Sequence, residues 1–172
     1  PHQRKALSNA HEYYKTHDRG KMIMACGTGK TFTALRLAEQ ETQNKGLILV
    51  LVPSIALINQ TLNEWNSFSN KDIFPICVCS DSTASRLKKN DADDIDDSPV
   101  DLAMPACTSV KSVVKQIATA CKDADGMVVV YSTYQSLDVV GEAQKYLNGE
   151  KKSKQASLFN DIDIPKRDYT FD

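Results

Sequence analysis

The strongest structural signal in the sequence lies near the N-terminus, in the stretch Lys21-Met-Ile-Met-Ala-Cys-Gly-Thr-Gly-Lys-Thr31. Its apolar first part, Lys21 to Cys26, predicts a short buried strand, and apolar residues near helical spacing predict a helix from Thr31 to Gln43. Glycines between a strand and a helix let the backbone curl so that successive N–H groups point at an anion, and the start of the helix adds partial positive charge. The stretch therefore predicts a loop that binds phosphate.

Two side chains of this loop have the chemistry that a nucleotide triphosphate requires. Lys30 can reach the β- and γ-phosphates as a point charge, and the Thr31 hydroxyl can bind Mg²⁺, so ATP and Mg²⁺ are the expected cofactors and these two residues the candidate catalytic groups. The full phosphate-loop pattern has Gly five residues before Gly29, where this sequence has Met24, and an ordinary Gly-rich turn is the alternative. The expected nucleotide contacts within the loop are Ala25, Cys26, Gly27, Thr28, Gly29, Lys30 and Thr31.

Outward from the loop, apolar runs alternate with helical patterns. The aliphatic run from Leu47 to Val52 is typical of a strand buried on both faces; Pro53 ends it, and Ser54 can cap the helix that follows. Further strands are expected at 74–79 and 127–131, and helices at 55–68, 108–122 and 134–147. Such alternation predicts an α/β fold, a parallel sheet with helices on both faces.

Composition limits the classes of protein that remain. A chain of 172 residues with 41% hydrophobic and 25% charged residues is one globular domain, and a net charge of −1 excludes a histone-like polycation. An acidic insertion is expected at about 81–106, and Asp91 to Asp101 alone holds six aspartates, which leaves the remainder net positive. The polar segment from Asn148 to Asp168 is expected to be an exposed connection.

The five cysteines are odd in number and form no Cys-x-x-Cys pair, which disfavours a disulfide scaffold or a zinc site and favours a reducing cytoplasm. No apolar run approaches the ~20 residues that a membrane span needs, so no membrane partner is expected. The sequence begins at a proline rather than at an initiator Met, which indicates a piece of a longer protein or a processed chain.

Residues Met24 to Thr31 resemble motif I of superfamily 2 helicases and translocases, in the variant found in the motor subunits of restriction enzymes. The N-terminal segment from Pro1 to Ala6 resembles the segment before motif I whose Gln contacts adenine, which makes Gln3 a candidate nucleotide contact. A carboxamide can donate to adenine N7 and accept from its N6 amine. The alternative for this segment is the start of a solvent-facing helix.

Two strand exits resemble further motifs of the superfamily. Residues 52–60 resemble motif Ia and residues 131–137 resemble motif Ib, and the resemblance implies contacts with nucleic-acid phosphates there. Leu57 and Trp65 are expected in the core, and Tyr134 is expected to be packed, with stacking on a base as its alternative. The candidate nucleic-acid contacts are Ser54, Gln60, Ser132, Thr133 and Gln135.

Residues 78–83 and the acidic stretch after them are similar to the helicase region of type ISP restriction–modification enzymes. These are single-chain enzymes that join nuclease, translocase, methyltransferase and target-recognition parts. The resemblance implies a P-loop, RecA-like lobe of an ATP-dependent DNA helicase or translocase. It also implies double-stranded DNA as the partner, together with the rest of the motor and possible nuclease and methyltransferase domains.

The acids that hydrolysis requires are not evident. The superfamily carries Asp-Glu-Ala-His after a hydrophobic strand, whereas this sequence has no Asp-Glu dipeptide, and Phe171 resembles the start of that strand. Asp81 is an internal substitute, and the second lobe with its arginine finger is not recognisable. Residues 1–172 are therefore expected to be a partial lobe, truncated before the Walker B strand, that binds nucleotide and weakly binds DNA without turnover.

Three alternatives remain open. An RNA helicase would share the superfamily, but Met24 and the acidic insertion disfavour it. A stand-alone nucleotide-binding or interaction module would have no motor activity. A small-molecule kinase would share the loop, but it would normally carry its own acids and an Arg-rich lid.

Overall fold

The computed structural model describes residues 2–79, 106–123, 125–150, 162–165 and 167–171. Within these residues one parallel sheet contains β1 (Gly46–Val52), β2 (Ile73–Val78), β3 (Ala106–Cys107) and β4 (Met127–Thr133), in the order β1-β4-β2-β3. The chain passes from β1 to β2 and then returns to place β4 between them, so the two crossovers cover opposite faces of the sheet. The predicted parallel α/β fold is confirmed.

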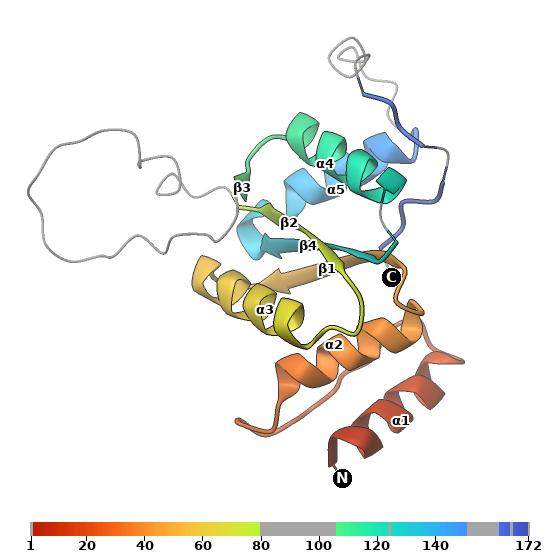
Figure 1. The fold of residues 1–172 in the computed structure, drawn as a ribbon, viewed down its shortest axis with the longest axis vertical. Helices are drawn as coiled ribbons and strands as arrows, with labels where there is room; N and C mark the ends of the chain where they lie inside the picture. The colour runs from red at the N-terminus through yellow and green to blue at the C-terminus, as the bar shows by residue number, and fades with distance from the viewer. Residues whose placement is uncertain (1, 80–105, 124, 151–161, 166, 172) are drawn as a thin grey trace, which may run out of the picture.

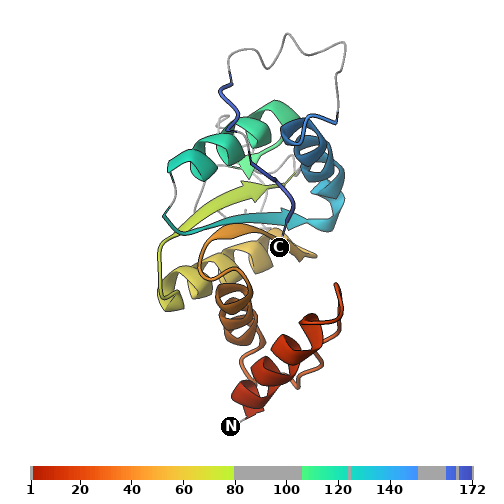
Figure 2. The same cartoon turned by 90° about the vertical axis from the view of Figure 1, so that its right-hand side faces the viewer.

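The helices form layers on both faces of the sheet. On one face lie α2 (Lys30–Glu41) and α3 (Ile55–Phe68); on the other lie α4 (Val110–Asp123) and α5 (Leu137–Leu147), the latter preceded by the 3₁₀ turn η1 (Tyr134–Ser136). The first helix, α1 (His2–Tyr14), is an outer element that packs beside α2 rather than on the sheet. Figure 2 shows this stacking, with α1 farthest from α4 and α5.

The core is divided by the sheet into two clusters. Because strand side chains alternate, Val128 and Val130 of β4 pack toward α4 and α5, whereas Met127, Val129 and Tyr131 pack toward α2 and α3. Every residue of β4 is buried, as expected of a central strand covered on both faces.

The strand predicted at Lys21–Cys26 is wrong. Residues 21–25 are irregular, and Ile23 is 91% exposed. No strand of the described part of the chain pairs with this segment, so its N–H and C=O groups have no ladder partners that would hold it in a sheet. The local apolar pattern is strand-like, but a strand also requires a neighbour.

The C-terminal part differs in places from expectation. Residues 167–171 are irregular, and the strand expected from Phe171 onward lies outside the described residues; Tyr169 is buried, and its hydroxyl donates to the Pro165 carbonyl at 3.0 Å. Ile162 and Ile164, placed by the sequence in an exposed connection, pack against the α4–α5 side of the core. The short strand β3 was not predicted. Asp81 and nearly all of the acidic insertion lie outside the described residues, as do residues 151–161.

Candidate nucleotide and nucleic-acid site

The Gly-rich loop adopts a tight, left-handed turn before α2. Gly27 has φ 73° and Gly29 has φ 79°, a region that glycine enters without the penalty that a Cβ imposes. The Thr28 hydroxyl and the Lys30 ammonium both donate to the Ala25 carbonyl, at 2.7 and 3.3 Å. The loop is thus closed by its own hydrogen bonds, and the Lys30 ammonium lies against the loop backbone.

Among the described residues, no side chain caps the N-terminus of α2. Its N-cap residue is Gly29, which offers no side-chain acceptor, and its first turn contains no acidic residue. By contrast, α3 is capped as the sequence predicted, because the Ser54 hydroxyl oxygen accepts from the Leu57 N–H at 3.4 Å. The first N–H groups of α2 have no intrahelical partners and point toward the loop, where they can bind an anion.

The structure places Gln3, in the first turn of α1, against the loop. Its amide nitrogen donates to the Thr28 carbonyl at 3.0 Å, and the His2 ring nitrogen lies 3.2 Å from the same oxygen. A Cβ on Gly29 would collide with the Gln3 amide nitrogen, so glycine at this position leaves room for the Gln3 amide against the loop. Sequence reasoning missed His2, whose position next to Gln3 was its only signal.

Two further features surround this junction. At the other end of α1, His11 contacts the Glu41 carboxylate of α2 at 3.0 Å. A cavity of about 530 Å³ separates α1 from the segment before the loop, and it is lined in part by His2, Lys5, Asn9, Tyr13, Lys21 and Ile23. Because His2 touches both the cavity and the loop, the cavity adjoins the candidate phosphate site.

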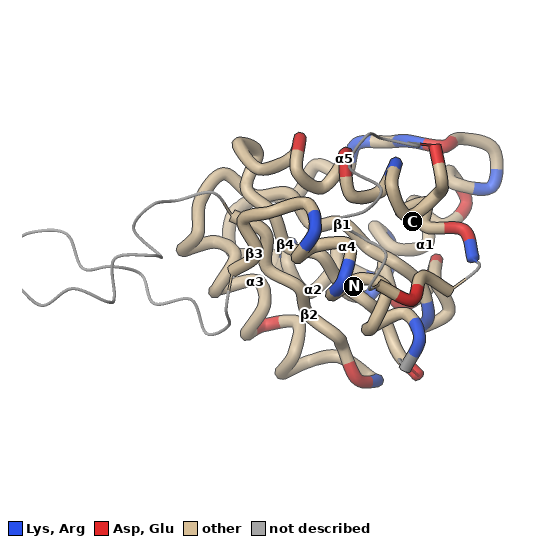
Figure 3. Tube along the Cα trace, turned by 90° about the horizontal axis from the view of Figure 1, so that it is seen from above, with Lys and Arg blue, Asp and Glu red and all other residues tan. Residues whose placement is uncertain are grey.

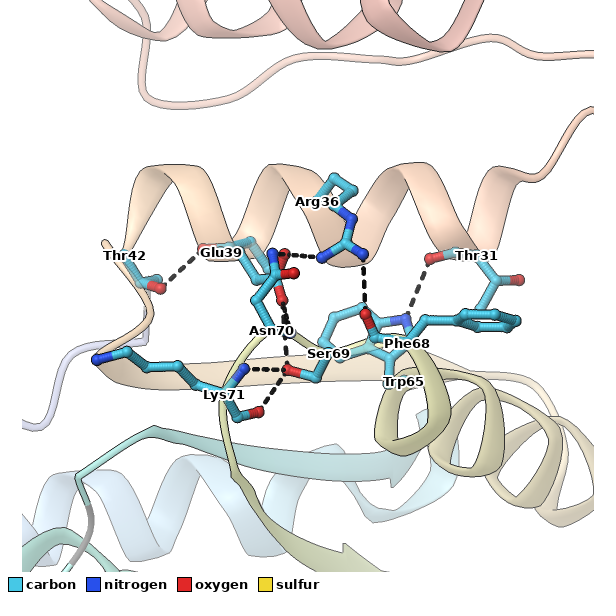
Figure 4. Close-up of polar contacts among 10 residues, drawn as sticks. Thr31, Arg36, Glu39, Thr42, Trp65, Phe68, Ser69, Asn70 and Lys71 are labelled. Carbon is cyan, nitrogen blue, oxygen red and sulfur yellow. Dashed lines mark hydrogen bonds and ion pairs between the residues drawn. The ribbon is translucent and has the colours of Figure 1, made fainter.

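Helix α2 is held to α3 by polar contacts along its length (Figure 4). At its start the Trp65 indole N–H donates to the Thr31 carbonyl at 3.1 Å, and in its middle Arg36 donates to the Phe68 carbonyl at 2.9 Å. Near its end the Glu39 carboxylate, which is 4% exposed, accepts from Arg36 and from the backbone N–H of Asn70, the latter at 2.7 Å. The burial of Glu39 was not predicted from the sequence.

The exits of β1 and β4 lie side by side, because Val52 pairs with Thr133 at the ends of the two parallel strands. The segments that resemble motifs Ia and Ib therefore continue from the same edge of the sheet. Ser54 and Gln135 are exposed there. Gln60 is also exposed, and its amide donates to Glu64 one turn along α3 at 2.9 Å.

Two of the predicted phosphate contacts point inward. Ser132 is buried and its hydroxyl donates to the Thr133 carbonyl at 3.1 Å, while the buried Thr133 hydroxyl lies 3.3 Å from the hydroxyl of Ser136. These hydroxyls stabilise the turn after β4 and are not presented to a ligand at the surface.

The apolar side chains at this edge also differ from expectation. Trp65 is in the core, 3% exposed, as predicted. Leu57 and Tyr134 were both expected to be packed, but they are 38% and 58% exposed. The first turn of α3 and the exit of β4 therefore present apolar surface at the edge where nucleic acid was predicted to bind.

Charge near the loop favours an anionic ligand. Residues 1–30 contain six Lys or Arg and two acids, together with all three histidines of the chain. Elsewhere Figure 3 shows basic and acidic residues interspersed, with no broad basic face on the side that it displays.

No cluster of three or more His, Cys, Asp or Glu that could hold a metal ion occurs among the described residues. No helix in the described ranges is both long and apolar enough to cross a bilayer.

Comparison with known proteins identifies the family of the chain. Residues 1–161 match the family described as the res subunit of type III restriction enzymes. The chain belongs to this family. A comparison with curated proteins found no match.

Two solved structures resemble this member of the res-subunit family over most of its length. One is a nuclease-deletion mutant of the type ISP restriction–modification enzyme LlaGI in complex with a DNA substrate mimic: 38% identity, TM-score 0.66, 85% of this chain and 14% of that one. The other is the ATP-dependent type ISP enzyme LlaBIII bound to DNA: 39% identity, TM-score 0.68, 84% of this chain and 9% of that one. The res-subunit chain thus spans a small part of these enzymes. The resemblance to the helicase region of type ISP enzymes is confirmed.

Proposed function

We propose that this chain is the ATP-binding part of an ATP-dependent DNA translocase or helicase of a restriction–modification system. The observation that carries the proposal is the loop itself. Two left-handed glycines precede an uncapped helix N-terminus, with Lys30 and Thr31 as the first two residues of that helix. Membership of the res-subunit family and the similarity to type ISP enzymes support it.

In this proposal the N–H groups of residues 27–31 bind the phosphates, and Lys30 exchanges its contact with the Ala25 carbonyl for a β- or γ-phosphate oxygen. Gln3 lies close enough to the loop to contact the base of the same nucleotide while one amide hydrogen remains on Thr28. The alternative of a solvent-facing helix start does not account for a Gln3 side chain that turns toward the loop.

Mg²⁺ fits this site as an ion that arrives with the nucleotide. Magnesium keeps most of its ligands as water and phosphate oxygens and needs few protein groups, and the Thr31 hydroxyl can supply one. When bound, the ion neutralises charge that develops on the phosphates. Because the sequence has no Asp-Glu dipeptide to supply the carboxylates that hold Mg²⁺ and orient the attacking water, we expect the 172-residue chain alone to bind ATP without releasing phosphate.

DNA is proposed to bind through its backbone at the shared exit of β1 and β4. Exposed Ser54, Gln60 and Gln135 are the candidate donors, since the hydroxyls of Ser132 and Thr133 are engaged inside the protein. Contacts of this kind carry little sequence information, and their affinity falls with salt. We therefore expect weak, sequence-independent and salt-sensitive binding of double-stranded DNA. Nuclease and methyltransferase parts belong to the same proposal for the parent enzyme.

Calorimetric titration with ATP and Mg²⁺ tests the nucleotide site. Lys30→Ala removes a charge-assisted contact worth about 1.5–3 kcal/mol, so affinity should fall about 10- to 160-fold. Lys45→Ala is the matched control, because Lys45 is an exposed lysine paired with Asp125 at 2.9 Å and lies after α2. Equal affinities of the wild-type and Lys30→Ala chains would remove the loop from the nucleotide site.

A further inference from the structure

Trp65 of α3 contacts the start of α2 from outside the loop. It lies in the last turn of α3, is 3% exposed, and donates its indole N–H to the Thr31 carbonyl at 3.1 Å (Figure 4). That carbonyl belongs to the second residue of α2. The contact therefore fixes the first turn of the helix, immediately beside the loop.

The indole ring also packs against the sheet. Its edge meets the ring of Tyr131 of β4, with centroids 6.1 Å apart and planes at 72°, and Tyr131 is fully buried. Leu35, one turn after Thr31, is fully buried in the same cluster. Trp65 thus connects the first turn of α2 to the rigid centre of the fold.

We infer that Trp65 is a positioning residue for the magnesium–nucleotide complex, because it orients the first turn of α2 and with it the Thr31 hydroxyl. This inference rests on the proposed nucleotide site. Threonine is β-branched, so in a helix its χ1 is restricted mainly to two rotamers, and the positions that its hydroxyl can reach move with the backbone that Trp65 holds. Magnesium requires near-ideal octahedral geometry, whereas Lys30 acts as a point charge on a flexible stem and tolerates small displacements.

The inference predicts that Trp65 affects the part of the ATP affinity that depends on Mg²⁺. Loss of the indole N–H should weaken the gain in ATP affinity that Mg²⁺ provides, and should change little the affinity for ATP without the metal. A residue that only stabilises the fold would affect both affinities equally or neither.

The test is calorimetric titration of the wild-type and Trp65→Phe chains with ATP, in Mg²⁺ and in EDTA. Phenylalanine keeps an aromatic ring and removes the donor. The dissociation constant in EDTA divided by that in Mg²⁺ measures the gain in ATP affinity that the metal provides. We expect Trp65→Phe to lower this ratio about 2- to 10-fold, the size of one lost hydrogen bond, while its dissociation constant in EDTA stays within about twofold of the wild-type value. Ser69→Ala is the matched control, because it deletes a 3.3 Å contact with Glu39 near the other end of α2 and should leave the ratio unchanged.

The outcomes separate the two proposals. If Trp65→Phe keeps the wild-type ratio, the positioning role is wrong and the nucleotide site stands. If the wild-type chain binds no ATP, or Lys30→Ala binds as tightly as wild type, the proposed function itself fails.

The wild-type chain offers a second test if circular dichroism shows that Trp65→Phe does not fold. Trp65 is the only tryptophan in the sequence, so tryptophan emission, excited selectively over the six tyrosines, reports on the surroundings of this side chain. ATP with Mg²⁺ should change the emission, and ATP in EDTA should change it less. Unchanged emission at saturating ATP and Mg²⁺ would overturn the inference.

Discussion

Glu39→Ala should be among the most destabilising single substitutions in this chain. The carboxylate is 4% exposed and accepts from Arg36, from the Asn70 backbone and side chain at 2.7 and 2.9 Å, and from Ser69 at 3.3 Å. Together these contacts join the end of α2 to the connection between α3 and β2 (Figure 4). Alanine removes the acceptor and leaves every donor in place.

The expected loss of unfolding free energy depends on the contacts that remain after Glu39 is replaced. Breaking a buried ion pair typically costs about 3–5 kcal/mol. The lower end applies here, because the Arg36 side chain is 24% exposed and keeps its 2.9 Å bond to the Phe68 carbonyl. With a urea m-value of about 1–3 kcal/mol/M, a loss of about 3 kcal/mol lowers the unfolding midpoint by about 1–3 M.

Urea unfolding followed by Trp65 fluorescence and by circular dichroism measures this shift. Glu39→Gln should lose less, because the amide oxygen can still accept one of the hydrogen bonds. Glu12→Ala is the matched control, since Glu12 is 75% exposed and pairs only with Lys15 among the salt bridges of the described chain. If Glu39→Ala and Glu12→Ala unfold at the same urea concentration, the buried network does not hold α2 to α3.

Three further predictions concern the cysteines, the pH and the strand exits. Cys26 is exposed in the loop and should be alkylated first at pH 8, and saturating ATP with Mg²⁺ should slow its labelling; labelling that ATP leaves unchanged would contradict a nucleotide on the loop. Burial raises the pKa of the Cys77 thiol to about 12 from 9.0, so its contribution to stability is complete below pH 9 and is lost as the pH rises toward 12. Urea midpoints at pH 8 and pH 10 should show this loss, and Cys77→Ala should reduce it. Tyr134→Ala should weaken single-stranded DNA binding by roughly 1–3 kcal/mol if the exposed ring stacks on a base, and equal anisotropy titrations of both chains would exclude stacking.

The fold was predictable where burial dictates the local pattern. The helix predicted at 55–68 matches α3, and the aliphatic run at Leu47–Val52 matches β1 to within one residue. Helices cover both faces of the sheet, so the side chains of such a strand are apolar on both faces, and this burial is visible in the sequence as an apolar run. The Ser54 cap was predictable for a similar reason, because it depends only on residues close in sequence.

The features that were not predicted depend on contacts between residues that are distant in sequence. Residues 21–26 have a strand-like pattern, but pairing decides whether a strand forms, and the described part of the chain places none beside them. Ser132 and Thr133 are the last two residues of β4 and are buried; the Ser132 hydroxyl donates to the Thr133 carbonyl, and the Thr133 hydroxyl lies against that of Ser136. The burial of Glu39 depends on Asn70, which lies 31 residues away.

The amide spectrum of the loop tests the central claim, that residues 25–31 hold the triphosphate. Phosphate oxygens that accept from backbone N–H groups shift those amide resonances directly. Titration of ¹⁵N-labelled chain with ATP and Mg²⁺ should move the amides of Gly27, Gly29, Lys30 and Thr31 most, and Lys30→Ala should reduce the shifts at equal ATP. If ATP instead shifts amides elsewhere and leaves those of the loop unchanged, the nucleotide binds at another place and the account is wrong.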